Sequence, residues 1–193
     1  ASLLPNYSGG APLVWAIING EKKTGITLFQ MNEGVDSGPI LGQEEEPILD
    51  EDNIKTLYGR IEKKGLDLIR NYLPKLSAGT HELQEQDETM RKIYPQRSPE
   101  DGLIDFNLSH VEIKNFIRAQ TKPYPGAFIF NKKKNKKIII WECDNFSCQH
   151  NQTPGSLIYF ENSWGICCND GVIIPKIVNY DNNDSFFKPE YFE

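Results

Sequence analysis

The sequence lacks the features that mark a membrane-spanning or nucleic-acid-binding protein. No apolar run approaches the roughly 20 residues that a bilayer span requires, and the longest runs are short, such as residues 13–18. The start of the chain has no basic stretch followed by an apolar core, so no secretory signal is visible and we expect a cytoplasmic protein. Basic residues are outnumbered, with 21 Lys and Arg against 27 Asp and Glu and a net charge of -6, which argues against a partner bound mainly through phosphates.

Cysteine and histidine are scarce, with four and three residues respectively. No two cysteines have the two-residue spacing of a zinc knuckle, and an adjacent pair cannot present two ligands in the usual way. The histidines share no spacing and lie in polar or loop contexts. We therefore expect free thiols, surface histidines and no metal. The residues in question are Cys143, Cys148, Cys167 and Cys168, and His81, His110 and His150.

The length and composition are those of an ordinary folded protein, with 193 residues of which 38% are hydrophobic. Domains typically run to about 100 to 150 residues, so the chain can hold one large or two small domains. Residues 79–96 are polar and without period, which indicates an extended connection. We place the domain boundary near Pro99, so the predicted domains span residues 1–98 and 99–193.

The first predicted domain mixes helices and strands. After a short apolar helix, a strand buried on both faces is predicted over 24–31 and a second strand over about 40–46. The loop between them has a glycine on either side of an aspartate. The clearest helix spans 50–77, because apolar residues recur there at helical spacing, and Asp52 or Asn53 is its expected N-cap.

The second predicted domain has one helix and several short strands. Ser109 and Glu112 form a capping box, and the helix must stop before Pro123. Short β-forming runs separated by turn residues follow, and five or so such strands suggest a small OB-like β-barrel. The predicted strands span 127–130, 138–142, 156–160, 165–168 and 172–178.

A lysine run lies between the first two of these strands and comprises Lys132, Lys133, Lys134, Lys136 and Lys137. Such a run could contact tRNA or another polyanion. A solvated hairpin tip that also blocks edge pairing is the favoured interpretation.

A long ordered series of motifs occupies the first half of the chain. It contains Ser2-Leu3-Leu4-Pro5, Gly9-Gly10-Ala11-Pro12, Trp15, Asn19-Gly20, Thr24-Gly25-Ile26-Thr27 and Gly34-Val35-Asp36-Ser37-Gly38-Pro39. The series resembles the formyltransferases that use 10-formyltetrahydrofolate, in which a serine-leucine-leucine-proline segment and a glycine-x-aspartate-[serine or threonine]-glycine loop lie this far apart. The resemblance is close from Ser2 to about Phe130 and continues only by strand pattern thereafter.

Three segments of the second half, 96–102, 115–119 and 123–128, resemble the branch that formylates the amine of nucleotide-linked amino sugars. The resemblance implies transfer of formyl from 10-formyltetrahydrofolate to the 4-amino group, or as second choice the 3-amino group, of a nucleotide-linked dideoxy sugar. A dTDP-linked sugar for surface polysaccharide such as O-antigen is the expected substrate. Methionyl-tRNA formyltransferase is the weaker match.

The resemblance also implies that part of the enzyme is not in this chain. The family places an asparagine and a histidine, one residue apart, directly before the segment that starts here, so they would precede Ala1, and a βαβ series that holds most of the folate earlier still. We therefore expect an α/β fold, with the C-terminal portion of a Rossmann-like formyltransferase domain followed by the small barrel. The chain alone should be inactive. If Ala1 is instead the native start, a non-catalytic domain that binds nucleotide sugars is the alternative.

Asp36 is the candidate catalytic residue. When a sugar amine attacks the formyl carbon, the oxygen of the tetrahedral centre becomes negative and needs a preplaced donor, which is the family's asparagine. A base must remove the amine proton, and the family's histidine suits that task. A carboxylate hydrogen-bonded to it would raise the pKa of the imidazole. Gly34 and Gly38 would let the loop bring Asp36 inward without steric cost. The alternative is a turn aspartate with local backbone hydrogen bonds.

The other candidates are binding residues. Folate contacts are expected from Gly10, Asn32, Glu33, Gly34, Val35 and Asp36. The alternative is that these residues only allow the loop its conformation, and Gly10 departs from relatives that carry arginine.

The diphosphate and sugar are expected to contact Gln96, Arg97, Asn115, Arg118 and Tyr124, because guanidinium groups match phosphate oxygens and an amide can hydrogen-bond to hydroxyls. The alternatives are a domain-joining salt bridge for either arginine, a solvated helix position for Asn115 and a packed tyrosine. The apolar faces of the barrel strands are candidates for a homodimer contact.

Overall fold

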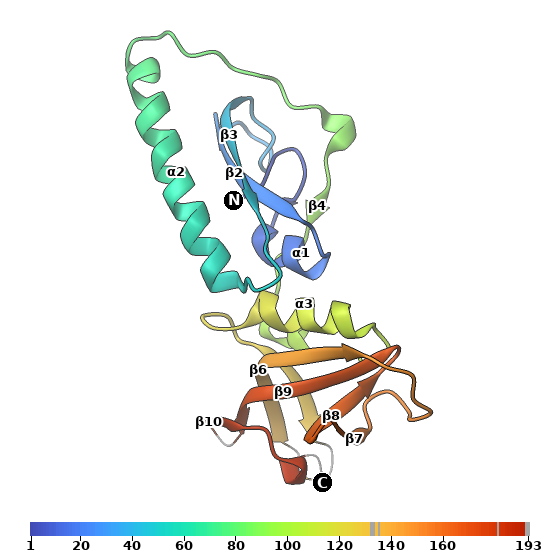
Figure 1. The fold of residues 1–193 in the computed structure, drawn as a ribbon. Helices are drawn as coiled ribbons and strands as arrows, with labels where there is room; N and C mark the ends of the chain where they lie inside the picture. Colours follow the sequence, from blue (N-terminus) through green and yellow to red (C-terminus); the bar gives the residue numbers. More distant parts are fainter. Residues whose placement is uncertain (132–133, 135, 181, 192–193) are drawn as a thin grey trace. The chain divides into compact units, whose positions relative to one another are not determined.

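A computed structural model describes residues 1–131, 134, 136–180 and 182–191 (Figure 1). The chain divides into two compact units, Ala1–Arg97 and Ser98–Glu193. This division lies one residue before the domain boundary proposed from the sequence. Both units mix helices with strands, so the protein has a mixed α/β structure.

The first unit is built on a strand pair and one long helix. Strand β2 (Lys23–Phe29) pairs antiparallel with β3 (Ile40–Pro47), and helix α2 (Ile54–Ser77) packs on both strands and also contacts α1 (Pro12–Ile18). Figure 1 shows α2 running beside the hairpin formed by β2 and β3. A short parallel pair, β1 (Ser8–Gly9) with β4 (Ile93–Tyr94), ties the start of the unit to its end, and the 3-10 helix η1 (Glu88–Met90) precedes β4.

The local sequence explains where α2 begins. The Asn53 side chain accepts the N–H groups of Lys55 and Thr56, and the Thr56 hydroxyl accepts the Asn53 N–H, so Asn53 is the cap and the helix starts at Ile54. Four residues of the predicted apolar face are buried, namely Ile54, Leu57, Ile61 and Leu68. Tyr58, Ile69 and Leu73 of the same face are exposed. The prediction that the first strand is buried on both faces is also wrong, since the second half of β2 is only half-buried.

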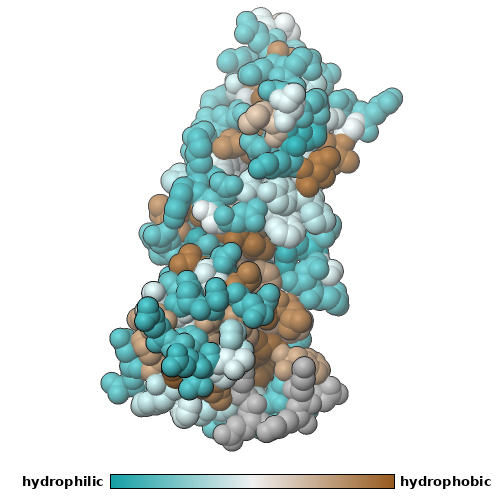
Figure 2. Space-filling model, turned by 90° about the vertical axis from the view of Figure 1, so that its right-hand side faces the viewer, coloured by the Kyte–Doolittle hydropathy of each residue, from teal (hydrophilic) through white to brown (hydrophobic). Residues whose placement is uncertain are grey.

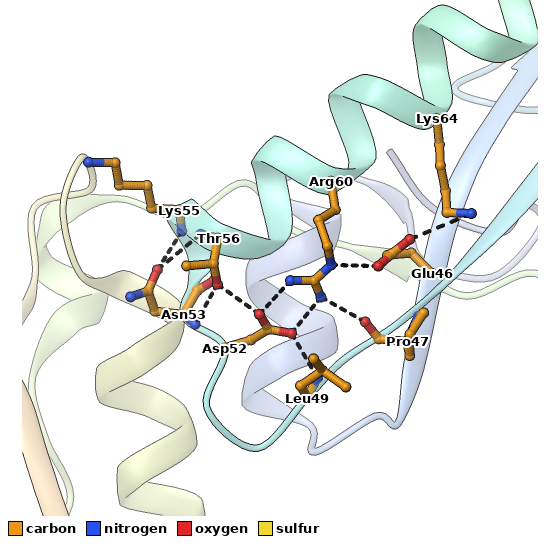
Figure 3. Close-up of polar contacts among 9 residues, drawn as sticks. All are labelled: Glu46, Pro47, Leu49, Asp52, Asn53, Lys55, Thr56, Arg60 and Lys64. Atoms are coloured by element: carbon orange, nitrogen blue, oxygen red, sulfur yellow. Dashed lines mark hydrogen bonds and ion pairs between the residues drawn. The ribbon is translucent and has the colours of Figure 1, made fainter.

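A cluster of charged side chains anchors the start of α2 to β3 (Figure 3). The Arg60 guanidinium donates to both carboxylate oxygens of Asp52 at 2.6 Å, to Glu46 Oε1 at 2.5 Å and to the Pro47 carbonyl at 3.0 Å. Asp52 is only 3% exposed. Burial raises the pKa of the Asp52 carboxyl, but hydrogen bonds, led by those from Arg60, outweigh that effect and lower the pKa to about 2. Asp52 therefore remains ionised and is paired in the folded unit.

The second unit is an antiparallel sheet with one helix packed on it. Helix α3 (His110–Gln120) contacts the sheet, and the buried core contains Ile113 and Ile117 of the helix together with isoleucines of the strands. Ser109 caps α3 and Glu112 completes the capping box, which confirms that prediction. The remaining elements are η2 (Pro99–Gly102), β5 (Ala127–Asn131), β6 (Lys136–Ser147), β7 (Leu157–Phe160), β8 (Ser163–Cys168), β9 (Gly171–Tyr180), β10 (Asn183–Phe186) and η3 (Pro189–Tyr191).

The closed barrel that the sequence suggested is not confirmed, because the described strands form an open sheet. They pair in the order β5-β6-β9-β8-β7, with β10 added to β9. The outer edge of β5 is covered by the segment before α3: Leu103 bridges to Phe128, and the Ile104 N–H donates to the Phe128 carbonyl at 2.9 Å. The edge of β5 that barrel closure would use is therefore already occupied.

The surface carries both apolar and hydrophilic side chains (Figure 2), and the cysteines are unpaired. Figure 2 shows apolar side chains reaching the surface in several patches bordered by hydrophilic residues. Among the described residues, no helix combines the length and apolar composition that a bilayer crossing needs.

All four cysteines are free thiols, and burial raises the pKa of the Cys143 thiol to about 12. Within the same described part, no three His, Cys, Asp or Glu residues are grouped so as to hold a metal ion.

Candidate active site around Asp36

The aspartate loop joins β2 to β3 and is closed at its base by backbone contacts. The Gln30 N–H donates to the Pro39 carbonyl at 2.9 Å. Gly38 is needed because a Cβ there would lie 1.7 Å from the Gln30 carbonyl oxygen. Asp36, and neither flanking glycine, adopts the left-handed conformation, with φ of 51°. Aspartate is one of the few non-glycine residues that tolerate this region.

The Asp36 carboxylate points back toward the start of the chain. Its Oδ2 accepts the backbone N–H of Gly9 at 2.8 Å, and Gly9 has a left-handed φ of 93°. Desolvation lowers the pKa of the Ala1 amino group, whereas the negative charge of Asp36 raises it. Of these two effects the desolvation is the larger, so the pKa of the Ala1 amino group is lowered overall. The half-buried carboxylate accepts no other hydrogen bond from the described residues, so Oδ1 is open to a further donor.

Two side chains from the segment after α2 hold the loop from outside. The Gln86 amide donates to the carbonyls of Asp36 and Gly38, and the Arg91 guanidinium donates to the Val35 carbonyl at 2.9 Å. Glu88 pairs with Arg91 and raises the pKa of its guanidinium. Sequence reasoning missed Gln86 and Arg91, because they lie in the polar stretch read as a connection and no local pattern marks them.

Gly38→Ala should destabilise the first unit by about 1–3 kcal/mol, because the new methyl group would meet backbone atoms that cannot rotate away. Gly34→Ala is the matched control, since its Cβ would meet side-chain atoms of Ser37 and Asn32 and no backbone atom among its nearest neighbours, and the nearest of them, the Ser37 hydroxyl, can turn. The control should cost less than about 1 kcal/mol. Urea unfolding of both variants checks the difference, and equal costs would contradict the assigned role of Gly38.

The candidate folate residues of the loop are exposed. The Asn32 side chain accepts the Gly34 N–H at 3.1 Å and the Ser37 hydroxyl at 2.7 Å, which shapes the turn. Glu33, Gly34 and Val35 are exposed, with Val35 at 64%. Their backbone groups at the loop tip are thus accessible, whereas the Asn32 carboxamide oxygen is already engaged.

Gly10, Gln96 and Arg97 lie together beside an aromatic cluster. The Gly10 N–H donates to the Tyr94 carbonyl at 2.9 Å, and a Cβ on Gly10 would meet Gln96 at 2.4 Å. The Arg97 guanidinium lies 4.7 Å from the centroid of the Trp15 ring, and the Trp15 indole donates to a backbone carbonyl at 2.9 Å. Trp15 is half-buried. The structure thus brings three predicted residues to one place in the first unit.

The other three predicted substrate residues belong to the second unit. The Arg118 Nε donates to Asn115 Oδ1 at 2.9 Å within α3. Asn115 is buried, so the alternative of a solvated helix position is wrong. Tyr124 lies in the turn after α3, where its N–H donates to the Thr121 carbonyl.

Two histidines and three residues of the lysine run make contacts with described neighbours. His110 and His150 are half-buried, not surface residues as expected: His110 bonds to Asn145, and His150 Nε2 lies within 3.0 Å of the Gly171 carbonyl. Half of His81 is likewise covered. In the lysine run, Lys132 and Lys133 lie outside the described residues. Lys134 donates to the Glu190 carbonyl, and Lys136 and Lys137 lie over the rings of Tyr180 and Phe128.

Family models and solved structures give the same assignment for both units. Residues 1–73 match the model described as formyl transferase, and residues 97–185 match the model of the formyl transferase C-terminal domain. An N-formyltransferase from Helicobacter canadensis, solved with folinic acid and dTDP-3-aminofucose, is 24% identical with a TM-score of 0.71, over 90% of this chain and 63% of that one.

Two further structures have a similar fold. WlaRD, a sugar 3N-formyl transferase solved in the presence of dTDP and 5-N-formyl-THF, is 23% identical with a TM-score of 0.69, over 94% of this chain and 64% of its own. The methionyl-tRNA formyltransferase from Clostridium thermocellum is 26% identical with a TM-score of 0.61, over 74% of this chain and 60% of its own. This chain thus spans less than two thirds of each of the three proteins. Because the two family models together cover most of both units, and solved formyltransferases share the fold, the chain belongs to the formyl transferase family.

Proposed function

We propose that the protein containing this chain transfers a formyl group from 10-formyltetrahydrofolate to the amine of a nucleotide-linked amino sugar. The 4-amino and 3-amino dideoxy sugars are the candidate acceptors, with dTDP as the candidate nucleotide and surface polysaccharide such as O-antigen as the destination. The folate derivatives and dTDP named for the two sugar enzymes support both parts of the proposal. Both of those enzymes carry a 3-amino designation, which strengthens the case for the 3-amino acceptor.

The position of the Asp36 carboxylate carries this proposal. It is fixed by the Gly9 N–H on one oxygen at 2.8 Å, and its negative charge acts to raise the pKa of the Ala1 amino group. The family's asparagine and histidine would precede Ala1, so the imidazole of the histidine would approach the carboxylate from that side. The Oδ1 atom is then available to accept an imidazole N–H, which orients the ring and stabilises its protonated form.

Formyl transfer needs a base and a hydrogen-bond donor for the oxyanion beside Asp36. The sugar nitrogen forms a bond to the formyl carbon, and the bond from that carbon to N10 of the folate breaks. The amine proton passes to the imidazole, the imidazolium gives a proton to N10 as it leaves, and the products are the formamide and tetrahydrofolate. Asp36 forms and breaks no covalent bond in this reaction. Its charge stabilises the imidazolium as the amine loses its proton, while the asparagine would donate a hydrogen bond to the developing oxyanion.

We assign the substrate contacts to two groups of residues. The exposed loop tip, Asn32 to Val35, and Gly10 are proposed to meet the folate through backbone groups. For the diphosphate and sugar the proposed residues are Gln96, Arg97, Asn115, Arg118 and Tyr124. The Arg97 guanidinium is oriented by the Trp15 ring beneath it, so it would bind a phosphate without first having to be ordered.

A substrate comparison tests the proposal. The full protein is supplied with 10-formyltetrahydrofolate and, separately, with dTDP-linked 3-amino and 4-amino sugars and with charged initiator tRNA, and tetrahydrofolate release is measured. We expect turnover with an amino sugar and at least about 100-fold lower kcat/KM with tRNA, which corresponds to roughly 2.7 kcal/mol of transition-state binding. Turnover with tRNA alone would identify a methionyl-tRNA formyltransferase, and no turnover with any acceptor would favour a nucleotide-sugar-binding protein.

Residues 1–193 alone are proposed to be inactive, because the asparagine and histidine of the family motif are not among them. We place the reaction in the cytoplasm, since both proposed substrates are soluble small molecules. A homodimer through the second unit stays a prediction.

A further inference from the structure

The Gln86 side chain links two points of the aspartate loop. Its Nε2 donates to the Asp36 carbonyl at 2.9 Å and to the Gly38 carbonyl at 2.6 Å, across sequence separations of 50 and 48 residues. It reaches the loop because Gln84 pairs with Ile40 through two backbone hydrogen bonds of 2.7 and 2.9 Å. We propose that Gln86 is a positioning residue for formyl transfer, which holds the Asp36 backbone so that the carboxylate meets the base. This inference rests on the proposed function.

The chemistry of the amide fits this task. Two carbonyl oxygens need two donors from one direction, and the amide NH₂ supplies both without a charge. Gln86 Oε1 is buried and accepts no hydrogen bond from the described residues. The reverse orientation of the amide would set Oε1 against two carbonyl oxygens, so the two carbonyls fix which way the side chain points. Both polar contacts that the Gln86 side chain makes with the described residues are therefore donations to the loop.

The loop needs such support because Asp36 is held in a sparsely populated conformation. A left-handed residue with a side chain persists only where its surroundings determine it from several sides. At Asp36 the side chain is held by Gly9 and the carbonyl by Gln86, while Arg91 holds the preceding carbonyl of Val35. Among the described residues only Gln86 bonds to both Asp36 and Gly38, so it fixes the distance between the left-handed residue and the closed base of the loop.

Gln86→Met tests the inference at nearly constant volume, because it removes both donors and adds no charge. Misplacement of a catalytic group by about 1 Å can cost roughly 100-fold in rate, so we expect kcat of the full protein to fall by about 10-fold to 100-fold. The KM values for folate and sugar should change by less than about threefold, because substrate contacts are not removed. Glu85→Gln, at the exposed neighbouring position, is the control and should keep the wild-type kcat.

A second measurement needs no substrate. Loss of two hydrogen bonds to the loop should speed hydrogen exchange of the Gly9 amide by about tenfold, since this N–H is protected by the Asp36 carboxylate. If Gln86→Met does not fold, Gln86→Glu, which keeps the shape of the amide and loses its donors, is judged by the same criteria. Unchanged Gly9 exchange in a folded variant overturns the inference. Absence of formyl transfer in the wild type would instead refute the proposed function, and Gly9 exchange would still decide the role of Gln86.

Discussion

Replacement of Asp36 by asparagine in the full protein should lower kcat for formyl transfer by about 100-fold to 10,000-fold, because Asp36 supports the imidazole that acts as general base, and such a base usually contributes a factor of about this size. Asparagine tolerates the left-handed conformation that Asp36 adopts at φ 51°, and its Oδ1 can accept the Gly9 N–H in place of the carboxylate. The loop should therefore keep its shape. What is lost is the negative charge that would stabilise an imidazolium.

Asp50→Asn provides the control for this substitution. Asp50 is an exposed carboxylate of the same unit that pairs only with exposed Lys22 at 3.4 Å, so the same chemical change there should leave kcat within about twofold, as is usual for surface positions. Both variants should unfold at the same urea concentration as the wild type. An Asp36→Asn protein that keeps wild-type turnover would show that the carboxylate has no role in proton transfer.

Arg60→Met is expected to destabilise the first unit by about 3–5 kcal/mol, because removing one partner of a buried ion pair leaves an uncompensated charge. Arg60 is the cation that joins buried Asp52 and Glu46, and it is itself 31% exposed. Lys64, 3.6 Å from Glu46, keeps part of the compensation for that carboxylate and places the effect at the lower end of the range. Urea unfolding measures this loss of stability as a shift of the midpoint concentration, provided that the slope of the unfolding free energy against urea concentration is unchanged.

Arg70→Met is a control on the same helix. Arg70 is 73% exposed and pairs only with Asp67, one turn away, so its loss should cost no more than about 0.5 kcal/mol. Similar costs for the two arginines would mean that the cluster in Figure 3 does not anchor α2.

The same cluster predicts how the effect of Arg60→Met depends on pH. Because the pKa of Asp52 is lowered to about 2 in the folded unit, its contribution to stability is complete above the unfolded pKa of about 3.9. That contribution is lost as the pH falls from about 4 to 2, when Asp52 takes up a proton. The stability difference between wild type and Arg60→Met should therefore shrink over this interval. A difference that stays constant down to pH 2 would contradict the pairing.

Local patterns predicted the elements whose stabilising contacts are close in sequence. The caps of α2 and α3 involve residues two or three positions apart, so the pair Ser109 and Glu112 could be recognised directly and the cap of α2 could be narrowed to Asp52 or Asn53. Strand β10 could not, because Asn183–Phe186 has no alternating apolar pattern. It is a strand only because the end of β9 offers it an unpaired edge.

The sequence by itself determined the family, the motif around Asp36 and most of the helices and strands. Tertiary structure alone decided that the second unit forms an open sheet, since strand order depends on which edges meet and on what covers them. It also decided how the Asp36 loop is held. Gly9 and Gln86 lie 27 and 50 residues from Asp36, and a hydrogen bond between such distant positions leaves no periodic trace in the residues around it.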